Sequence, residues 1–155
     1  MRFFRRVQVT PVLDTSAYAA NDQMSTLQTV RVSTANRYPG GEIVCITVLD
    51  KAAQSQPLDL FFFDRSVTLA ADQAAASISD ADMEFCLGGV NILAVDYDAT
   101  AANTIATVAP PAGLPVISYA TGWTIYMALV TRGSPTYAAG SLVISVTAAL
   151  EEGTG

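Results

Sequence analysis

The first side chains in this sequence whose spacing could support chemistry are two carboxylates. Asp96 and Asp98 are two residues apart, so in a strand they would face the same way. A pair of carboxylates can serve as acid and base in the cleavage of a glycosidic bond. Acidic residues that end a strand at the solvent give the same pattern, and the neighbouring sequence does not separate the two interpretations.

A second acidic group could offer oxygen ligands to calcium. It consists of Asp80, Asp82 and Glu84, but it lacks the glycine and the terminal glutamate of an EF-hand loop. Ser79 and Asp82 loosely resemble a capping box, which predicts one helical turn. We therefore expect these carboxylates to be solvated or to cap that turn, and we expect no metal site.

Histidine is absent from the sequence, which removes the commonest general base and metal ligand. Neither a Ser–His–Asp nor a Cys–His arrangement can be assembled, and two cysteines alone cannot complete a tetrahedral zinc site. The glycine pairs Gly40-Gly41 and Gly88-Gly89 are typical of turns and not of a phosphate-binding loop. The sequence predicts a protein that is not an enzyme and that binds no cofactor.

Cys45 and Cys86 are the only two cysteines. Cys45 lies in an apolar stretch, which favours two buried, reduced thiols. A disulfide would need their Cα atoms within roughly 7 Å, which leaves that alternative open at the level of sequence.

Composition predicts one folded domain, residues 1–155, with few charges on its surface. Hydrophobic residues make up 51% of the chain and charged residues only 14%, a balance that excludes a disordered protein. A sparsely charged surface suits a subunit that neighbours cover, because the centres of protein interfaces are depleted of charge.

Charge is distributed unevenly along the chain. The net charge is −6, yet Arg2, Arg5 and Arg6 supply three of the eight basic residues, so the rest of the chain carries five basic against fourteen acidic groups. The excess of acidic residues after the N-terminus argues against direct binding to nucleic acid.

No targeting segment is expected in this sequence. Val7–Leu13 is interrupted by polar residues, so it does not form the apolar region of a signal peptide. No apolar stretch reaches the about 20 residues that a membrane span needs, and we expect the protein to be synthesised in the cytoplasm.

Short apolar stretches predict an all-β protein. Ile43–Leu49 is apolar on both faces, which places it in the middle of a sheet, and Leu58–Phe63 follows as a second strand. The other predicted strands are Phe3–Leu13, Leu27–Thr34, Val90–Tyr97, Asn103–Val108, Gly122–Thr131 and Ser141–Leu150. About eight strands without a βαβ rhythm predict a single β-sandwich with Greek-key or jelly-roll connections.

The end of the chain predicts a hairpin followed by a tail. The connection Arg132–Gly140 contains glycine and proline, so we expect the last two strands to pair with each other. Trp123 shares a face with Ile125 and Met127, which predicts that it is buried and not a platform for sugar rings. Residues 151–155 are expected to form a flexible tail.

Two groups of residues are candidates for a partner interface. If Leu58, Leu60 and Phe62 point into the sandwich, Phe61 and Phe63 lie on the opposite face and need cover, from another subunit or from a loop of the same chain. Residues 1–6 form a short basic arm, which either docks on a partner or merely extends the first strand with its arginines in water. The candidate interface residues are Arg2, Phe3, Phe4, Arg5, Arg6, Phe61 and Phe63.

Several segments together resemble a known family. Asp14-Thr-Ser-Ala-Tyr18, followed by Asn21-Asp22, resembles an early segment of the small β-sandwich head decoration (cement) proteins of tailed bacteriophages. The later segments that resemble this family, in order, are Val48–Asp50, Leu58–Asp64, Ile78–Asp82 and Trp123–Val130. The resemblance extends from Val7 to Leu150 and consists of common residue types.

The resemblance implies a non-enzymatic virion structural protein on the outer surface of the head. Such a protein binds the major capsid protein lattice, stabilises the head and is often a homo-oligomer, commonly a trimer. The basic arm would then contribute to capsid docking, or pair with acidic groups of a neighbouring copy. Alternatives are another phage structural component, from the neck, tail or baseplate, and a carbohydrate-binding β-sandwich module.

Overall fold

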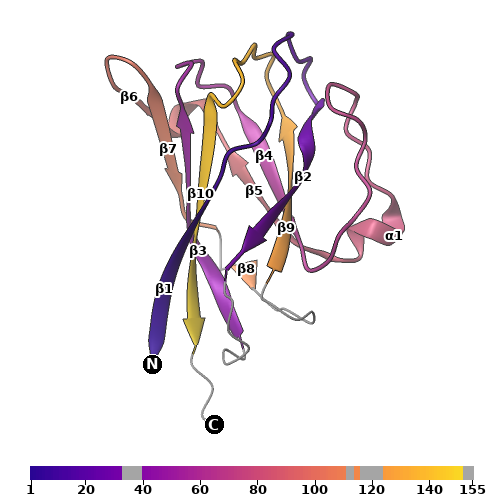
Figure 1. Cartoon of the computed structure of the whole chain (residues 1–155), viewed down its shortest axis with the longest axis vertical. Helices are drawn as coiled ribbons and strands as arrows, with labels where there is room; N and C mark the ends of the chain where they lie inside the picture. The colour runs from indigo at the N-terminus through magenta and orange to yellow at the C-terminus, as the bar shows by residue number, and fades with distance from the viewer. Residues whose placement is uncertain (33–39, 111–113, 116–123, 152–155) are drawn as a thin grey trace.

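The strands of the protein form two antiparallel sheets packed face to face (Figure 1). This computed structural model describes residues 1–32, 40–110, 114–115 and 124–151. The six-stranded sheet contains, in spatial order, β1 (Arg2–Val9), β10 (Leu142–Glu151), β3 (Gly40–Asp50), β7 (Thr104–Val108) and β6 (Tyr97–Ala99), with β8 (Leu114–Pro115) paired to β3. The four-stranded sheet contains β2 (Gln23–Arg31), β9 (Thr124–Thr131), β4 (Leu58–Phe63) and β5 (Cys86–Ile92).

The strand order is that of a jelly roll. Leaving out the short strands β6 and β8, one sheet runs β1-β10-β3-β7 and the other runs β2-β9-β4-β5. The chain crosses between the sheets at most of its connections, as two interlocked Greek keys require. The predicted β-sandwich is confirmed, and β6 and β8 are additions to the expected set of strands.

β3 lies at the centre of its sheet, between β10 and β7, as its apolar character on both faces predicted. Ile43, Ile46 and Val48 are buried in the core between the sheets. Ile43 and Ile46 both point inward although they are three residues apart. The register between β3 and β10 shifts at this point, which leaves an extra residue in β3 and restores the inward direction.

β4 buries both of its faces, each in a different hydrophobic cluster. Leu58, Leu60 and Phe62 point into the main core, as predicted. Phe63 is fully buried in a second cluster on the outer side of the four-stranded sheet, and Phe61 is partly buried there. Residues 64–85 of the same chain, the covering segment, contribute Val67, Leu69 and Ile78 to this cluster.

The cover over β4 is therefore a loop of the same chain and not another subunit. This corrects the candidate interface, because Phe63 is not accessible to a partner. The physical reason is that the connection from β4 to β5 is long enough, and carries enough apolar side chains, to fold back over the sheet.

Hydrogen bonds fasten the covering segment to the sheet. The backbone of residues 73–76 lies beside the start of β2, where Gln23 N donates to Ala74 O at 2.8 Å and Ala76 N donates to Asn21 O at 2.8 Å. The carboxylate of Asp72 accepts from the Tyr18 hydroxyl at 2.8 Å and from Ser25 N at 2.7 Å. The segment thus extends one layer over the four-stranded sheet, on the right of Figure 1.

The predicted helical turn is present within the covering segment. Helix α1 comprises Asp80–Met83, and the Ser79 side chain accepts from Asp82 N at 3.1 Å as its N-cap. Asp82 Oδ2 also accepts from Thr68 N at 3.2 Å. This carboxylate therefore has a structural role in closing the loop.

The predicted hairpin between the last two strands is wrong. β9 pairs with β2 and β4, whereas β10 pairs with β1 and β3 in the other sheet. Glycine and proline in the connection favour a reversal of direction, but they do not determine in which sheet the next strand pairs. The connection of residues 132–141 is long enough to cross the roughly 10 Å between packed sheets.

Asp50 closes the turn between β3 and β4 from a fully buried position. Its carboxylate accepts three backbone hydrogen bonds, from Ala52 N at 2.9 Å, Gln54 N at 2.8 Å and Ser55 N at 2.9 Å. Ala53 and Ser55 adopt positive φ angles of 52° and 49°, which non-glycine residues seldom do. Asp50 thus holds a turn whose backbone is not in its preferred conformation.

Three tyrosines make stability sensitive to high pH. Burial raises the pKa of Tyr97 and of Tyr137, and the nearby charge of Asp50 raises both further. Burial also raises the pKa of Tyr18, which donates its hydroxyl proton to Asp72. Because the pKa values are raised in the folded state, the stabilisation is complete below the unfolded pKa of about 10 and is lost as pH rises above it.

We therefore expect the free energy of unfolding in urea to fall steeply above about pH 10. Tyr137→Phe should make this decline shallower, because the Tyr137 hydroxyl is buried without a hydrogen-bond partner in the described part of the chain and can be removed at little cost. A decline of equal slope in the unmodified protein and in this variant would contradict the assignment to Tyr137.

Candidate interaction surfaces

The basic N-terminal residues form an edge strand and not a free arm. β1 is paired with β10 along its whole length, from Arg2 opposite Glu151 to Val9 opposite Ile144. Alternation places Val7 and Val9 against the core, so Phe3 and Arg5 have the same inward parity. Arg2, Phe4 and Arg6 share the outward parity, and we refer to these three as the β1 stripe.

The β1 stripe presents an aromatic ring between two guanidinium groups. Phe4 is 69% exposed. Arg2 forms an ion pair with Glu42, and its guanidinium carbon lies 5.9 Å from the centre of the Phe4 ring. Arg6 Nη2 donates to Ser145 Oγ at 2.9 Å, which fixes Arg6 on the outer side of the sheet. Exposed aromatic and arginine side chains of this kind are enriched at protein interfaces.

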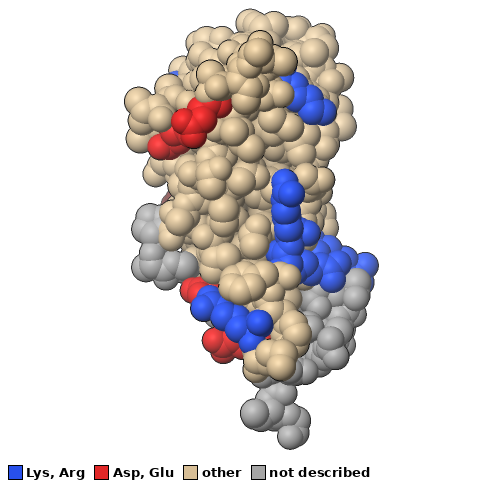
Figure 2. Space-filling view, turned by 90° about the vertical axis from the view of Figure 1, so that its left-hand side faces the viewer, with Lys and Arg blue, Asp and Glu red and all other residues tan. Residues whose placement is uncertain are grey.

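The outer face of the six-stranded sheet carries almost no charge in its middle. β10 from Leu142 to Leu150, β3 from Val44 to Leu49, and β7 contain no charged residue. Figure 2 shows a broad uncharged area on this side of the molecule, with basic side chains beside it and acidic side chains towards its ends. We call it the open face; its outward side chains on these three strands are Val143, Thr147, Cys45, Thr47, Leu49, Ile105 and Thr107.

The open face is uncovered in the described part of the chain, in contrast to the outer side of the four-stranded sheet. Ile105 is 37% exposed and Thr107 is also exposed. The two outer surfaces of the sandwich thus differ: one is buried by the covering segment, and the other has no such cover within the described ranges.

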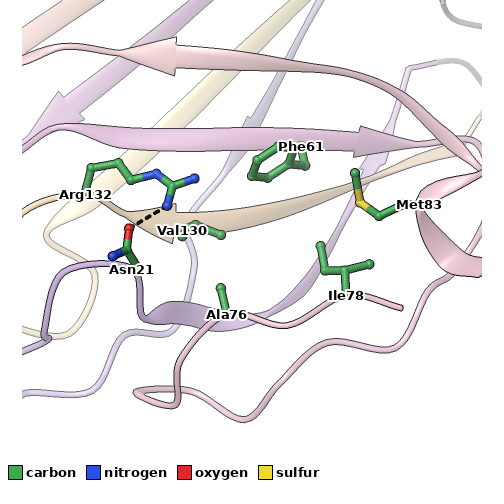
Figure 3. Close-up of a pocket in the computed structure, with 7 residues that line it drawn as sticks. All are labelled: Asn21, Phe61, Ala76, Ile78, Met83, Val130 and Arg132. Atoms are coloured by element: carbon green, nitrogen blue, oxygen red, sulfur yellow. Dashed lines mark hydrogen bonds between the residues drawn. The ribbon is translucent and has the colours of Figure 1, made fainter. Parts of the chain in front are cut away.

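A pocket opens where the covering segment meets the four-stranded sheet (Figure 3). Its volume is about 220 Å³, and its walls are the apolar side chains of Phe61, Val130, Ala76, Ile78 and Met83. Asn21 and Arg132 form its polar end. We call it the Phe61 pocket.

Arg132 is held rigidly at the polar end of the Phe61 pocket. Its Nε donates to Asp59 Oδ2 at 2.6 Å and its Nη1 donates to Asn21 Oδ1 at 2.6 Å. Asn91 Nδ2 donates to the other oxygen of Asp59 at 2.7 Å. Arg132 and Asp59 neutralise each other, so the pocket has no strong preference for an ion.

The residues considered for chemistry do not assemble into a reactive site. Asp96 accepts from Leu93 N at 2.7 Å at the end of a short 3-10 turn, η1 (Ala94–Asp96), whereas Asp98 is exposed on β6. Among the described residues, no group of three or more acidic, cysteine or histidine side chains could hold a metal ion. No helix in the described ranges is long and apolar enough to cross a membrane.

Both cysteines are free and lie in different sheets, Cys45 in β3 and Cys86 in β5. Each is partly exposed, whereas the sequence favoured burial. Cys45 points to the open face, because the shift in register next to it reverses the alternation of β3. Trp123 and residues 152–155 lie outside the described part of the chain.

The sequence pattern did not identify the open face, although a signal for it exists. From Ile43 to Leu49 the residues of both parities in β3 are uncharged, and this was attributed to burial on two sides. The same absence of charge in the neighbouring strands β7 and β10 would have indicated a shared uncharged surface, but the pairing of these three strands is a result of the fold.

Comparisons with known proteins give similarities to virus structures. No protein-family model matches the chain. No curated protein matches it either. A chain from the structure of tomato aspermy virus aligns with a TM-score of 0.47 and 11% identity, over 99% of this chain and 79% of that chain. A chain from turnip yellow mosaic virus aligns with a TM-score of 0.35 and 8% identity, over 100% and 96% of the two chains. For Desmodium yellow mottle tymovirus the TM-score is 0.36 at 11% identity, over 100% and 91%.

Because these TM-scores lie below 0.5 and the identities are 8–11%, the similarities carry no inference about function. The jelly-roll assignment stands on the strand order of the protein itself.

Proposed function

We propose that this protein is a non-enzymatic virion structural component, a decoration protein that binds the major capsid lattice and stabilises the head. The observation that carries the proposal is the open face, an uncharged side of a jelly roll whose opposite side the chain covers itself. The resemblance of several sequence segments to head decoration proteins of tailed bacteriophages supports the choice of partner.

The mechanism requires contact area and no bond making. A protein that binds the assembled lattice but not its separated subunits stabilises the assembled state by mass action. Threonine and small apolar side chains suit such a contact, because they lose little conformational freedom and need little desolvation. The open face offers such side chains on three adjacent strands, and Thr47 lies beside Thr107 in their register.

An arginine on the open face is expected to weaken head binding. Thr107→Arg places a long charged side chain on β7 where a flat contact would have to bury it. The matched control is Thr29→Arg, which changes an equally exposed strand threonine on β2, in the other sheet. Binding is measured by co-sedimentation with heads that lack the protein, and folding by thermal unfolding.

We expect Thr107→Arg to weaken binding at least about 10-fold, the size of one interface hot spot, and Thr29→Arg to bind normally. Heads without the protein should also release DNA at a lower temperature than complete heads. Equal binding by both variants, or equal heat resistance of the two kinds of head, contradicts the proposal. Co-sedimentation with isolated tails instead of heads would assign the protein to another structural component.

A further inference from the structure

The Phe61 pocket has the size and lining to hold one aromatic side chain. An apolar cavity of roughly 150 Å³ can bind benzene, and the pocket measures about 220 Å³ with five apolar side chains in its walls. It is smaller than the roughly 300–1,000 Å³ of sites for drug-sized ligands. A single phenyl ring fits it better than a larger molecule.

The short helix that supplies Met83 to the wall of the pocket also carries Asp80 and is followed by Glu84, and we call these two carboxylates the acidic rim. Both side chains are exposed. Neither forms an ion pair within the described ranges. These two carboxylates therefore have their charge available for a partner that brings basic groups.

Strand β1 carries an exposed aromatic ring with basic side chains beside it, which could fit the pocket and its acidic rim. Phe4 is the one aromatic residue among the large hydrophobic side chains that are exposed in the described part of the chain. Arg6 lies two residues further along β1, is exposed, and forms no ion pair within that part. Arg2 and Arg6 lie on the same face as Phe4. An apolar ring bordered by basic groups is complementary to an apolar pocket bordered by acidic ones.

The two surfaces lie on different layers of the same molecule. β1 belongs to the six-stranded sheet, whereas the pocket lies on the outer side of the four-stranded sheet. One chain therefore does not fill its own pocket with Phe4. A second copy can, and each copy then has one ring to offer and one pocket to fill.

We propose that Phe4 of one copy inserts into the Phe61 pocket of a second copy, with Arg6, which lies on the same face of β1 as Phe4, facing the acidic rim at Asp80 and Glu84. The contact joins two different surfaces, so it is heterologous and generates a closed ring or an open chain of copies. It concerns the isolated protein and does not depend on head binding, which the open-face variants test separately.

The test is the molar mass of the isolated protein by sedimentation over a wide range of concentrations. Phe4→Ala removes the ring, and Ala76→Leu fills the pocket while keeping the backbone bond of residue 76 to Asn21. The matched controls are Val12→Ala, which shortens another exposed apolar residue, and Ala75→Leu, whose neighbour lines the pocket but which does not itself line it.

The unmodified protein and both controls should associate alike, and each of the two test variants should weaken association by about 30-fold, as loss of an aromatic hot spot does. Arg6→Glu should also weaken association, and combining it with D80K and E84K should restore part of it. Thermal unfolding shows that each variant is folded.

A monomeric mass for the unmodified protein at every concentration overturns the proposal. So does association that survives Phe4→Ala, or that survives Ala76→Leu when Phe4→Ala abolishes it, because Phe4 would then bind elsewhere. Failure of the charge exchange to restore association overturns the role assigned to Arg6 and the acidic rim.

Discussion

Asp50→Ala is expected to lower the free energy of unfolding by about 4 kcal/mol, one of the largest effects available outside the apolar core. The substitution leaves three backbone N–H groups of the turn without their acceptor. It also releases Ala53 and Ser55 from positive φ angles that the carboxylate helps to hold. Urea unfolding at neutral pH measures the loss.

Two further variants distinguish the loss of these backbone hydrogen bonds from the loss of a negative charge. Asn at position 50 can keep one acceptor oxygen where Gln54 N and Ser55 N bind, so Asp50→Asn should lose about half as much. Asp14→Ala removes an exposed carboxylate that accepts from Ser16 N in a turn at the surface, and it should change stability less than Asp50→Ala. Equal losses for alanine and asparagine at position 50 would show that the turn does not depend on these bonds.

Phe63→Ala is expected to destabilise the protein by about 3–5 kcal/mol, as much as Phe62→Ala, although the two rings point to opposite faces of β4. Phe62 lies in the main core and Phe63 in the second cluster, and both are fully buried. The two losses should be equal because the covering segment buries Phe63 in a second hydrophobic cluster on the outer side of the sheet. Urea unfolding of both variants under the same conditions provides the comparison.

A double-mutant cycle tests the origin of the Phe63 effect. Val67 belongs to the covering segment and to the same cluster as Phe63. Phe63→Ala and Val67→Ala should therefore be non-additive, with a coupling of about 0.5–3 kcal/mol. Additive effects, or a loss for Phe63→Ala well below that for Phe62→Ala, would mean that the segment does not pack on β4.

Sequence reasoning succeeded where a local pattern determines the structure. The alternation of Leu58, Leu60 and Phe62 assigned the inward face of β4, and the apolar stretch of β3 placed it in the centre of a sheet. Ser79 and Asp82 identified the helical turn because a capping interaction involves residues three apart. In each case the relevant contacts repeat at a short, fixed spacing.

Prediction from the sequence failed where a strand pairs with a partner that is distant in the sequence. The pairing of β10 with β1 and β3, instead of β9, depends on the register of the whole sheet. For the N-terminal basic residues the sequence left open whether they form an arm or extend the first strand, because nothing near them in the sequence shows that β10 is available as a partner. The open face and the Phe61 pocket depend on the same long-range pairings and could not be predicted.

The pairing of β1 with β10 also determines how the chain must fold. β4 with β5 and β6 with β7 are neighbours in the sequence and can form early as local units. β1 has no partner strand until β10 has been synthesised, because the register joins the first strand to the last. High contact order of this kind slows folding to milliseconds or seconds, so the six-stranded sheet is completed last, and until then β1 has unpaired backbone on both sides.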